Sequence, residues 1–354
     1  MIGTRPEVIR SARLLSLLQR DPEVDLTLIN SGQHYDWNMM SGFLEELGAP
    51  PVTHDVHVGP GHPVHQTGVL VDGIGRALQE ERPDALAVFG DTNSSLAGAV
   101  AAARVVVPLV HIEAGCRSYD MSMPEEINRR SIDHMAALLL AVSEVGRANL
   151  EREDVMGRVE VIGDPLYDEF VTRQPERKPG SEEPAGLLTL HRPANVDDPK
   201  TLGSILDQLA EASDRTGVRW TFPVHPRTRG TVQGEWPGVD LVDPMLYEEL
   251  LGVLSRADVC VTDSGGLQKE ALWMEVPCVT VRTTTEWVET IAQGVNVLAP
   301  PGSDIAGAIA RSLTSEERDF TNPYGDGHAC ERAVNVMKDW IEGGARFPAR
   351  FDPS

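Results

Sequence analysis

Carboxylates stand where two short apolar runs end. Asp91 and Glu113 each follow a run rich in Val, Leu and Ile, and Glu125 and Glu126 open a segment with the period of a helix. If Asp91, Glu113 and Glu125 converge, repulsion and burial would separate their pKa values, so that one could act as a base and another as an acid. For Glu125 and Glu126 a structural explanation is equally good, because acidic residues stabilise a helix N-terminus. The placement of Asp91 and Glu113 favours proton transfer for the set.

A second group of candidate residues lies in the other half of the chain. Ser264, Gly265 and Gly266 stand between an apolar run and a segment of helical period. Backbone amides at a helix N-terminus, which a ligand can approach closely through glycines, form a cradle for pyrophosphate. Glu270 falls in the opening turns of the same helix and could reach a pair of ribose hydroxyls. The alternative for Glu270 is an ordinary exposed helix residue.

Histidine and arginine complete the candidate set. His191 and His225 each follow an apolar run, as does Arg282, whose planar guanidinium suits a phosphate or a carboxylate. A single histidine is usually structural or exposed, but two in such positions favour a functional role for at least one. Arg5 and Arg10 add positive charge near the N-terminus. These residues predict a compact anionic substrate.

The elements that carry these residues predict an α/β protein. Runs rich in Val, Ile and Leu alternate with longer segments of helical period, which is typical of parallel sheets built from βαβ units. Ligands of such sheets bind beyond the carboxyl ends of the strands. The expected strands are 25–30, 85–89, 109–112, 138–142 and 159–162 in the first half, and 187–190, 219–222, 259–262 and 277–281 in the second.

Two doubly wound domains that face each other across a central cleft are the simplest architecture. At roughly 150 residues per domain, the 354 residues suffice for two. We expect residues 1–165 to form an N-terminal Rossmann-like domain and 166–334 a C-terminal one, with a helix at about 335–354 that packs back on the first. The segment 174–184, dense in Pro, Glu, Lys and Gly, is expected to be a surface linker.

Composition excludes several classes of protein. The 54 acidic residues outnumber the 31 basic ones, and the net charge of -23 would repel nucleic acid. No apolar run is long enough for a transmembrane helix, and no signal peptide precedes Gly3, so we expect a cytoplasmic protein. Basic charge is carried mainly by arginine, and such an acidic, lysine-poor surface resembles proteins of salt-loving organisms. A GC-rich genome would also favour arginine.

Metal and dinucleotide cofactors find little support in the sequence. Four histidines have metal-like spacing but lie in a Gly/Pro-rich segment without carboxylate or cysteine partners, so no metal site is expected. Gly73 and Gly75 lack the third glycine of a dinucleotide fingerprint, so no nicotinamide is expected. The cysteines are widely separated, which favours buried free thiols. The histidines are His54, His57, His62 and His65, and the cysteines are Cys116, Cys260, Cys278 and Cys330.

The motifs together resemble those of the non-hydrolysing UDP-N-acetylglucosamine 2-epimerases, over nearly the whole chain. They occur in order as 3–7 (GTRPE), 33–34 (QH), 90–92 (GDT), 111–115 (HIEAG), 124–129 (PEEINR), 191–192 (HR), 223–226 (PVHP), 262–266 (TDSGG) and 282–286 (RTTTE). The resemblance implies an isomerase of polysaccharide biosynthesis with the glycosyltransferase-B fold and usually a homodimer. It implies interconversion of UDP-N-acetylglucosamine and UDP-N-acetylmannosamine through elimination of UDP, a 2-acetamidoglucal intermediate and re-addition, without metal or nicotinamide.

The same resemblance implies roles for individual residues. The catalytic residues would be Asp91, Glu113, Glu125 and His191. The substrate-binding residues would be Arg5, Arg10, Arg117, Arg129, His225, Ser264, Gly265, Gly266, Glu270 and Arg282. The proton at carbon 2 is weakly acidic, so its removal must be coupled to departure of UDP. Which carboxylate removes the proton and which returns it stays open.

Three departures from the family pattern bear on function. Only Met1 and Ile2 precede Gly3, so the first sheet is expected to lack a full central strand unless the start is placed too late. Asn195 follows Pro193 and Ala194 where the family commonly has an Arg/Ala-Glu-Asn sequence. Tyr35 and Asp36 follow the Gln33-His34 pair in place of glutamines that serve substrate activation in several members, so we expect no such activation.

Two alternatives belong to other functional classes. A glycosyltransferase of the same fold would share the sugar-nucleotide cradle but would need an acceptor site. A catalytically silent UDP-sugar-binding protein would need only the UDP contacts, and the presence of Asp91, Glu113, Glu125 and His191 argues against it.

Overall fold

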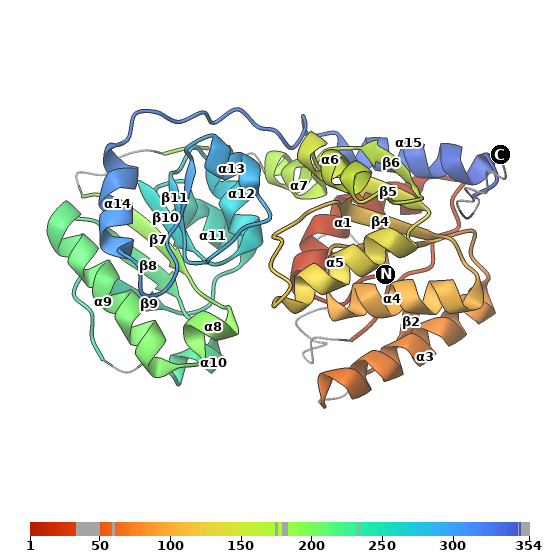
Figure 1. Cartoon of the computed structure of the whole chain (residues 1–354), viewed down its shortest axis with the longest axis horizontal. Coiled ribbons are helices and arrows are strands. Elements are labelled where there is room, and N and C mark those ends of the chain that lie inside the picture. The colour runs from red at the N-terminus through yellow and green to blue at the C-terminus, as the bar shows by residue number, and fades with distance from the viewer. Residues whose placement is uncertain are drawn as a thin grey trace. The chain divides into compact units, whose positions relative to one another are not determined.

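The computed structural model describes residues 1–32, 50–58, 61–173, 176–178, 183–232, 234–345 and 347. The chain divides into two compact units (Figure 1). The first unit contains Met1–Thr172 and Tyr324–Ser354, and the second contains Arg173–Pro323. The sequence placed these boundaries at 165/166 and 334/335. They differ because α7 (Pro165–Thr172) contacts α1 (Arg5–Arg20) and because α15 (Ala329–Glu342) begins before residue 335.

The first unit contains a parallel sheet in the order β3 (Leu86–Phe89), β4 (Leu109–Ala114), β5 (Leu138–Ala141) and β6 (Arg158–Val161). A separate parallel pair, β1 (Ile29–Asn30) and β2 (His54–Asp55), lies beside it. Ile2 forms a parallel bridge with Asn30, and the main-chain nitrogen of Met1 donates to the carbonyl of Ala87 at 3.0 Å. Met1 and Ile2 therefore lie between β1 and β3.

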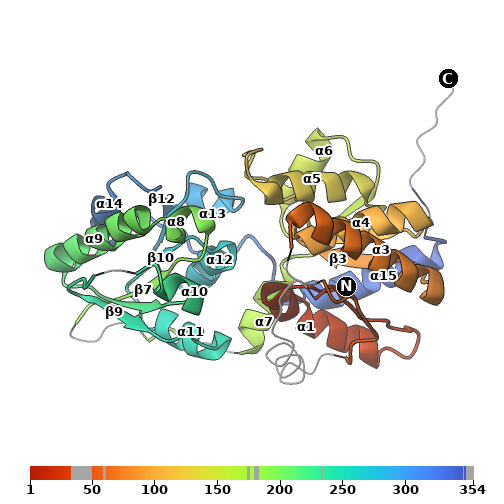
Figure 2. The ribbon, with the colours of Figure 1, turned by 90° about the horizontal axis from the view of Figure 1, so that it is seen from below.

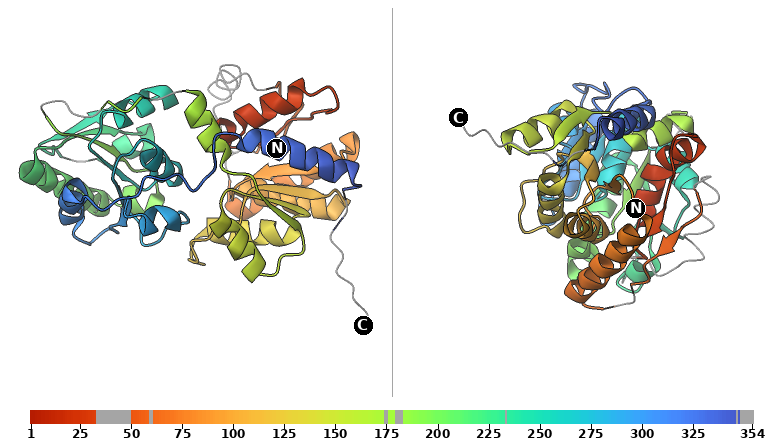
Figure 3. Two further views of the ribbon diagram at one scale, coloured as in Figure 1. Left: turned by 90° about the horizontal axis from the view of Figure 1, so that it is seen from above. Right: turned by 90° about the vertical axis from the view of Figure 1, so that its right-hand side faces the viewer.

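Helices cover both faces of this sheet. Alternate residues of β5 enter different cores, Leu139 and Ala141 one and Leu138 and Leu140 the other, as the period of two in a strand requires. Helices α3 (Pro63–Glu81) and α4 (Asn93–Val105) lie side by side on the first of these cores (Figure 2). Helices α1 and α15 pack together on the second (Figure 3). The remaining helices of this unit are α5 (Pro124–Met135), α6 (Glu144–Arg152) and α7.

The second unit is a six-stranded parallel sheet in the order β12, β11, β10, β7, β8, β9. The chain enters at β7, adds β8 and β9 on one side, and then crosses to β10, β11 and β12 on the other. The order therefore reverses between β7 and β10, which is where doubly wound sheets bind ligands. The strands are β7 (Ala185–Thr189), β8 (Arg219–Pro223), β9 (Val239–Val242), β10 (Val259–Thr262), β11 (Cys278–Thr280) and β12 (Asn296–Leu298).

The core of the second unit is built on α9 (Pro199–Thr216) and α14 (Ile305–Thr314). Their apolar faces pack with Trp220 and Phe222 of β8, which are fully buried. Helices α11 (Tyr247–Leu254) and α12 (Gly265–Trp273) contact β7, and β10 and β11, respectively. The shorter helices are α8 (Pro193–Val196), α10 (Pro226–Arg229) and α13 (Val288–Ala292).

All nine expected strands are present, most of them with changed bounds, and β10 has the expected bounds of 259–262. The strand expected at 25–30 is reduced to Ile29–Asn30, and that expected at 187–190 begins at Ala185. β2, β9 and β12 were not expected from the sequence. Within the described part of the chain, no helix combines the length and the apolar character needed to cross a membrane.

Candidate active site

Two carboxylates lie at the same edge of the first sheet, at the ends of β3 and β4. Asp91 follows β3, and Glu113 lies at an irregularity of β4 between Ile112 and Ala114, with a left-handed φ of 72°. Glu113 forms an ion pair with Arg10 of α1. A Cβ atom at Gly90 would lie 3.3 Å from Oε2 of Glu113, so a glycine before Asp91 leaves room for this carboxylate.

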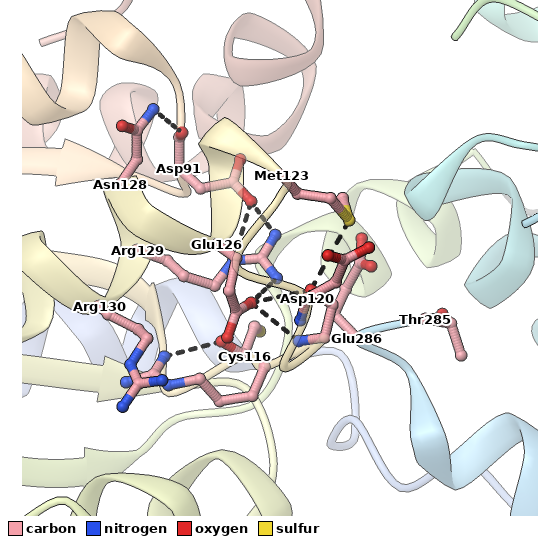
Figure 4. Close-up of polar contacts among 12 residues, drawn as sticks. Asp91, Cys116, Asp120, Met123, Glu126, Asn128, Arg129, Arg130, Thr285 and Glu286 are labelled. Atoms are coloured by element: carbon pink, nitrogen blue, oxygen red, sulfur yellow. Dashed lines mark hydrogen bonds and ion pairs between the residues drawn. The ribbon is translucent and has the colours of Figure 1, made fainter. Parts of the chain in front are cut away.

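Helix α5 holds Asp91 (Figure 4). The guanidinium of Arg129 donates to Oδ2 of Asp91 from Nε at 3.1 Å and also from Nη2. Nδ2 of Asn128 donates to the main-chain carbonyl of Asp91 at 2.9 Å. Arg129, expected to bind substrate, is therefore engaged with a candidate catalytic carboxylate, as is Arg10.

The neighbouring glutamates of α5 differ in their surroundings. Glu125 is half-buried, and its side chain makes no hydrogen bond or ion pair with any residue that the structure describes. Glu126 is fully buried and accepts hydrogen bonds from Ser118 and Arg129. Stabilisation of a helix terminus was the structural explanation for both glutamates. For Glu126 it is incomplete, because it does not account for the buried hydrogen bonds to Ser118 and Arg129. Its sequence neighbours gave no signal of this burial.

Arg117 belongs to a buried network under the carboxylates. Its Nη1 lies 2.7 Å from Asp133, and its Nε and Nη2 donate to Glu153 at 3.0 and 2.8 Å. Asp133 also binds Nδ1 of His111 at 2.6 Å, and Nε2 of His111 lies 2.8 Å from the carbonyl of Gly90. Burial alone would raise the pKa of Asp133. The charges and hydrogen bonds of His111 and Arg117 outweigh this effect, so the pKa lies below its ordinary value. Arg117 is therefore connected, through Asp133 and His111, to Gly90 in the turn before Asp91.

Glu7, on α1, joins the residues just before α1 to the residues that follow β3. Its Oε2 accepts from the main-chain nitrogens of Gly3 and Thr4 at 2.7 and 2.8 Å, and its Oε1 accepts from the hydroxyls of Thr92 and Ser95 at 2.7 and 3.2 Å. Burial raises the pKa of Glu7, although these hydrogen bonds oppose the change. In the sequence Glu7 was noted only as part of a motif. In the structure it is bound to Thr92, the residue that follows Asp91.

Asp263 organises the switch point of the second sheet. Its carboxylate accepts from the main-chain nitrogens of His191 and Arg192 and from Nδ2 of Asn195, all at 2.9–3.1 Å. Nδ1 of His191 lies 2.9 Å from Oδ1, and the His191 side chain remains 57% exposed. Burial would raise the pKa of Asp263, but the hydrogen bonds and the charge of His191 hold it below its ordinary value. Asn195 thus takes part in the site despite the unusual sequence before it.

The expected phosphate cradle has the geometry of a capped helix N-terminus. Oγ of Ser264 accepts from the main-chain nitrogen of Leu267 at 3.4 Å, and Gly265 and Gly266 form the first turn of α12. Amides in a first turn lie outside the helical hydrogen-bond pattern and are available to an anion. A Cβ atom at Gly265 would approach Oε1 of Glu286 to 2.8 Å, so a larger residue there would have to displace the Glu286 carboxylate. Glu286 in turn pairs with the buried Arg282 at 2.8 Å.

Glu270 is buried, so its interpretation as an ordinary exposed helix residue is wrong. The hydroxyl of Tyr247, the first residue of α11, donates to Oε1 of Glu270 at 2.7 Å. His225 is exposed after β8. The Arg5 side chain and the Gln33-His34 pair lie outside the described residues.

The histidines with metal-like spacing and the four cysteines can be placed in the structure. Among the described residues, no group of histidine, cysteine, aspartate and glutamate side chains could hold a metal ion. His54 instead lies 2.5 Å from Glu81, and His62 caps α3. All four cysteines are buried free thiols, as expected.

Two Rossmann-like units with these sites define a protein of the glycosyltransferase-B fold. The chain shares this fold with the glycosyltransferase SnogD from Streptomyces nogalater, with a TM-score of 0.51 and 15% identity over 95% of this chain and 98% of that one. Residues 16–338 match the family model described as UDP-N-acetylglucosamine 2-epimerase. The chain belongs to the UDP-N-acetylglucosamine 2-epimerase family.

Two relatives are similar over almost their whole length. A UDP-2,3-diacetamido-2,3-dideoxy-D-glucuronate 2-epimerase of Pseudomonas aeruginosa is 37% identical over 347 residues, which cover 95% of this chain and 98% of the relative. The crystal structure of the Methanocaldococcus jannaschii UDP-GlcNAc 2-epimerase, in complex with UDP-GlcNAc and UDP, has a TM-score of 0.87 and 32% identity, covering 96% of this chain and 98% of that one.

Proposed function

We propose that the protein interconverts UDP-N-acetylglucosamine and UDP-N-acetylmannosamine. The observation that carries the proposal is the pair of carboxylates at the ends of β3 and β4. Asp91 and Glu113 each have an arginine partner and share one sheet edge. An acceptor-dependent transferase or a simple UDP-sugar-binding protein has no need of this pair.

The second unit supplies the residues that would bind UDP. The amides of Gly265 and Gly266 and the hydroxyl of Ser264 would hold the diphosphate, with Arg282 and His225 adding positive charge or hydrogen-bond donors. The buried carboxylate of Glu270 would accept from the ribose hydroxyls. His191, fixed through Nδ1 by Asp263, would present its Nε2 side to the departing diphosphate.

The reaction needs a proton to leave carbon 2 and to return on the opposite face. One carboxylate takes the proton as the bond between carbon 1 and the UDP oxygen breaks, and a double bond forms between carbons 1 and 2. Re-addition of UDP follows delivery of a proton from the other face by another carboxylate. Asp91, Glu113 and Glu125 would share these two tasks. The proposed route uses no metal and no nicotinamide.

A second candidate substrate is UDP-2,3-diacetamido-2,3-dideoxy-D-glucuronate. It is favoured by the 37% identity to the P. aeruginosa epimerase that is named for this sugar. Its chemistry at carbon 2 would be the same, because the acidic proton and the UDP leaving group are unchanged. The two substrates differ in the groups at carbons 3 and 6.

Proton NMR in deuterated water tests the proposal. Each sugar nucleotide is incubated with the purified chain at low and at molar salt, since salt screens the self-repulsion that a net charge of -23 creates. Deuterium at carbon 2 together with the 2-epimer establishes the reaction and identifies the preferred sugar. Binding of UDP by a folded chain without any exchange would favour a silent binding protein. Product that appears only with an added acceptor would favour a glycosyltransferase.

A homodimer in the cytoplasm is part of the same proposal, as the family resemblance implies. Light scattering coupled to size-exclusion chromatography should give twice the mass of one chain. Fractionation of cells that express the chain should recover it with cytoplasmic enzymes.

A further inference from the structure

Glu126 is a buried carboxylate that the proposed reaction does not use. It is fully buried at the start of α5, and all its hydrogen bonds fall on one oxygen. Oε2 accepts from the main-chain nitrogen of Ser118 at 2.9 Å, from the Ser118 hydroxyl at 3.0 Å and from Nη1 of Arg129 at 3.0 Å. Within the described part of the chain, Oε1 has no hydrogen-bond partner.

Arg129 links this buried glutamate to Asp91 (Figure 4). The two residues stand three apart on α5, so their side chains lie on one face of the helix. Nη1 of Arg129 is held by Glu126, and the other edge of the guanidinium, Nε and Nη2, donates to Asp91. Arg129 is itself buried, so one cation is shared between two carboxylates.

The sharing determines which oxygen of Asp91 is covered. Both hydrogen bonds from Arg129 to Asp91 fall on Oδ2, and no described residue donates a hydrogen bond to Oδ1. A free guanidinium prefers to bind a carboxylate through both oxygens with two parallel hydrogen bonds. With Nη1 held by Glu126, the guanidinium is fixed in a position where Nε and Nη2 both meet Oδ2 instead of one oxygen each.

We propose that Glu126 is a positioning residue that acts through Arg129 to keep Oδ1 of Asp91 available to the substrate. The inference rests on the proposed function, in which Asp91 takes part in proton transfer. The charge of Glu126 is the essential property, because a neutral group would compete less well with Asp91 for the guanidinium. The hydrogen bonds from Ser118 hold the Glu126 side chain in position. They do not affect how strongly Glu126 and Asp91 compete for the guanidinium of Arg129.

The contacts of Glu126 make Glu126→Gln a sharp test. Because every hydrogen bond falls on Oε2, the amide oxygen of glutamine can accept all three, while the amide nitrogen takes the position of Oε1. The variant therefore keeps shape and hydrogen bonds and removes the charge. Ser118→Ala is the complementary variant, since it removes one hydrogen bond and keeps the charge. Glu160→Gln controls for loss of a carboxylate, because Glu160 lies on β6 and pairs with Arg158.

The expected result for Glu126→Gln is a fall in kcat of about tenfold or more, with KM, UDP affinity and melting temperature close to wild type. Ser118→Ala should lose less of kcat, and Glu160→Gln should match the wild type. A wild-type kcat in folded Glu126→Gln overturns the proposal, as does a loss of kcat only in step with melting temperature or KM.

A crystal structure of Glu126→Gln tests the inference independently of activity. Arg129 is expected to turn and bind both oxygens of Asp91. An Arg129 that still donates only to Oδ2 overturns the positioning role. If the wild type epimerises neither sugar nucleotide, the proposed function fails, and the crystal structure still decides whether Glu126 controls the contact between Arg129 and Asp91.

Discussion

Asp263 binds His191 twice, through the main-chain nitrogen of His191 at 3.0 Å and through its Nδ1 at 2.9 Å. The two residues follow the strands between which the second sheet reverses its order. The aspartate therefore fixes both the backbone and the ring of the histidine. It also determines which ring nitrogen points away from the protein.

Asp263→Asn should impair the function of His191 although the histidine itself is unchanged. Each carboxylate oxygen accepts a main-chain hydrogen bond, Oδ1 from His191 and Oδ2 from Arg192, so the amide nitrogen of an asparagine must lose one of them. We expect turnover to fall by roughly tenfold or more and the melting temperature to fall as well. Steady-state kinetics and thermal unfolding check this. Asp258→Asn removes an acceptor elsewhere in the same unit and is the control, and unchanged turnover in Asp263→Asn would contradict the role of Asp263.

The Asp133 network should make stability depend on pH. The pKa of Asp133 in the folded protein lies below its ordinary value of 3.8, because His111 and Arg117 outweigh the effect of burial. A carboxyl with a lowered folded pKa contributes stability above its unfolded value and loses it as the pH falls through the folded value. Wild type should exceed Asp133→Asn by about 3 kcal/mol in free energy of unfolding at pH 7, and by less below about pH 4. Urea unfolding at both pH values measures this, and a constant difference would contradict it.

Gly115→Ala and Gly203→Ala should change stability in opposite directions. Gly115 has φ 81°, and a Cβ atom there would lie 2.3 Å from the carbonyl oxygen of Gly146, so alanine should cost about 2 kcal/mol or more. Gly203 lies inside α9 with nothing within 4 Å of an added Cβ, so alanine should stabilise by about 0.5–1 kcal/mol. Chemical unfolding of both variants is the measurement. Equal effects would show that the backbone at Gly115 relaxes readily.

Glu113→Gln should separate binding from chemistry. The amide keeps the shape of the side chain beside Arg10 but cannot take up a proton. We expect UDP to bind as in the wild type, because the proposed UDP contacts lie in the second unit, and turnover to fall by about a hundredfold or more. Calorimetric titration with UDP and the deuterium-exchange assay check the two halves. Turnover equal to the wild type would remove Glu113 from the catalytic set.

The sequence predicted the elements better than the contacts. Strands in the middle of each sheet, such as β5 and β10, are continuous apolar runs and were found within one residue. The short strands β2, β9 and β12 were missed, because two to four residues with partly exposed side chains carry little pattern. The strand at 25–30 was overestimated for a related reason, since only its last two residues find a partner.

The candidate site was predicted by position but not by pairing. Motifs located Asp91, Glu113 and Ser264, because they follow strands and the ends of parallel strands share an edge. Pairing depends on residues far apart in the chain, and His191 and Asp263 are 72 positions apart. For the same reason Arg117 was expected at the substrate, whereas it is enclosed by Asp133 and Glu153. A single sequence contains no record of such partners.

The placement of α15 has a consequence for the order in which the protein is made. Cys330, Met337 and Trp340 of this helix complete a core that also contains Leu14 and Phe89. A ribosome therefore releases the whole of the second unit before the first unit can close its core. During synthesis, the apolar face of segment 1–172 that packs against α15 therefore stays exposed until α15 has left the ribosome. This segment is the part of the chain that a chaperone would be expected to bind.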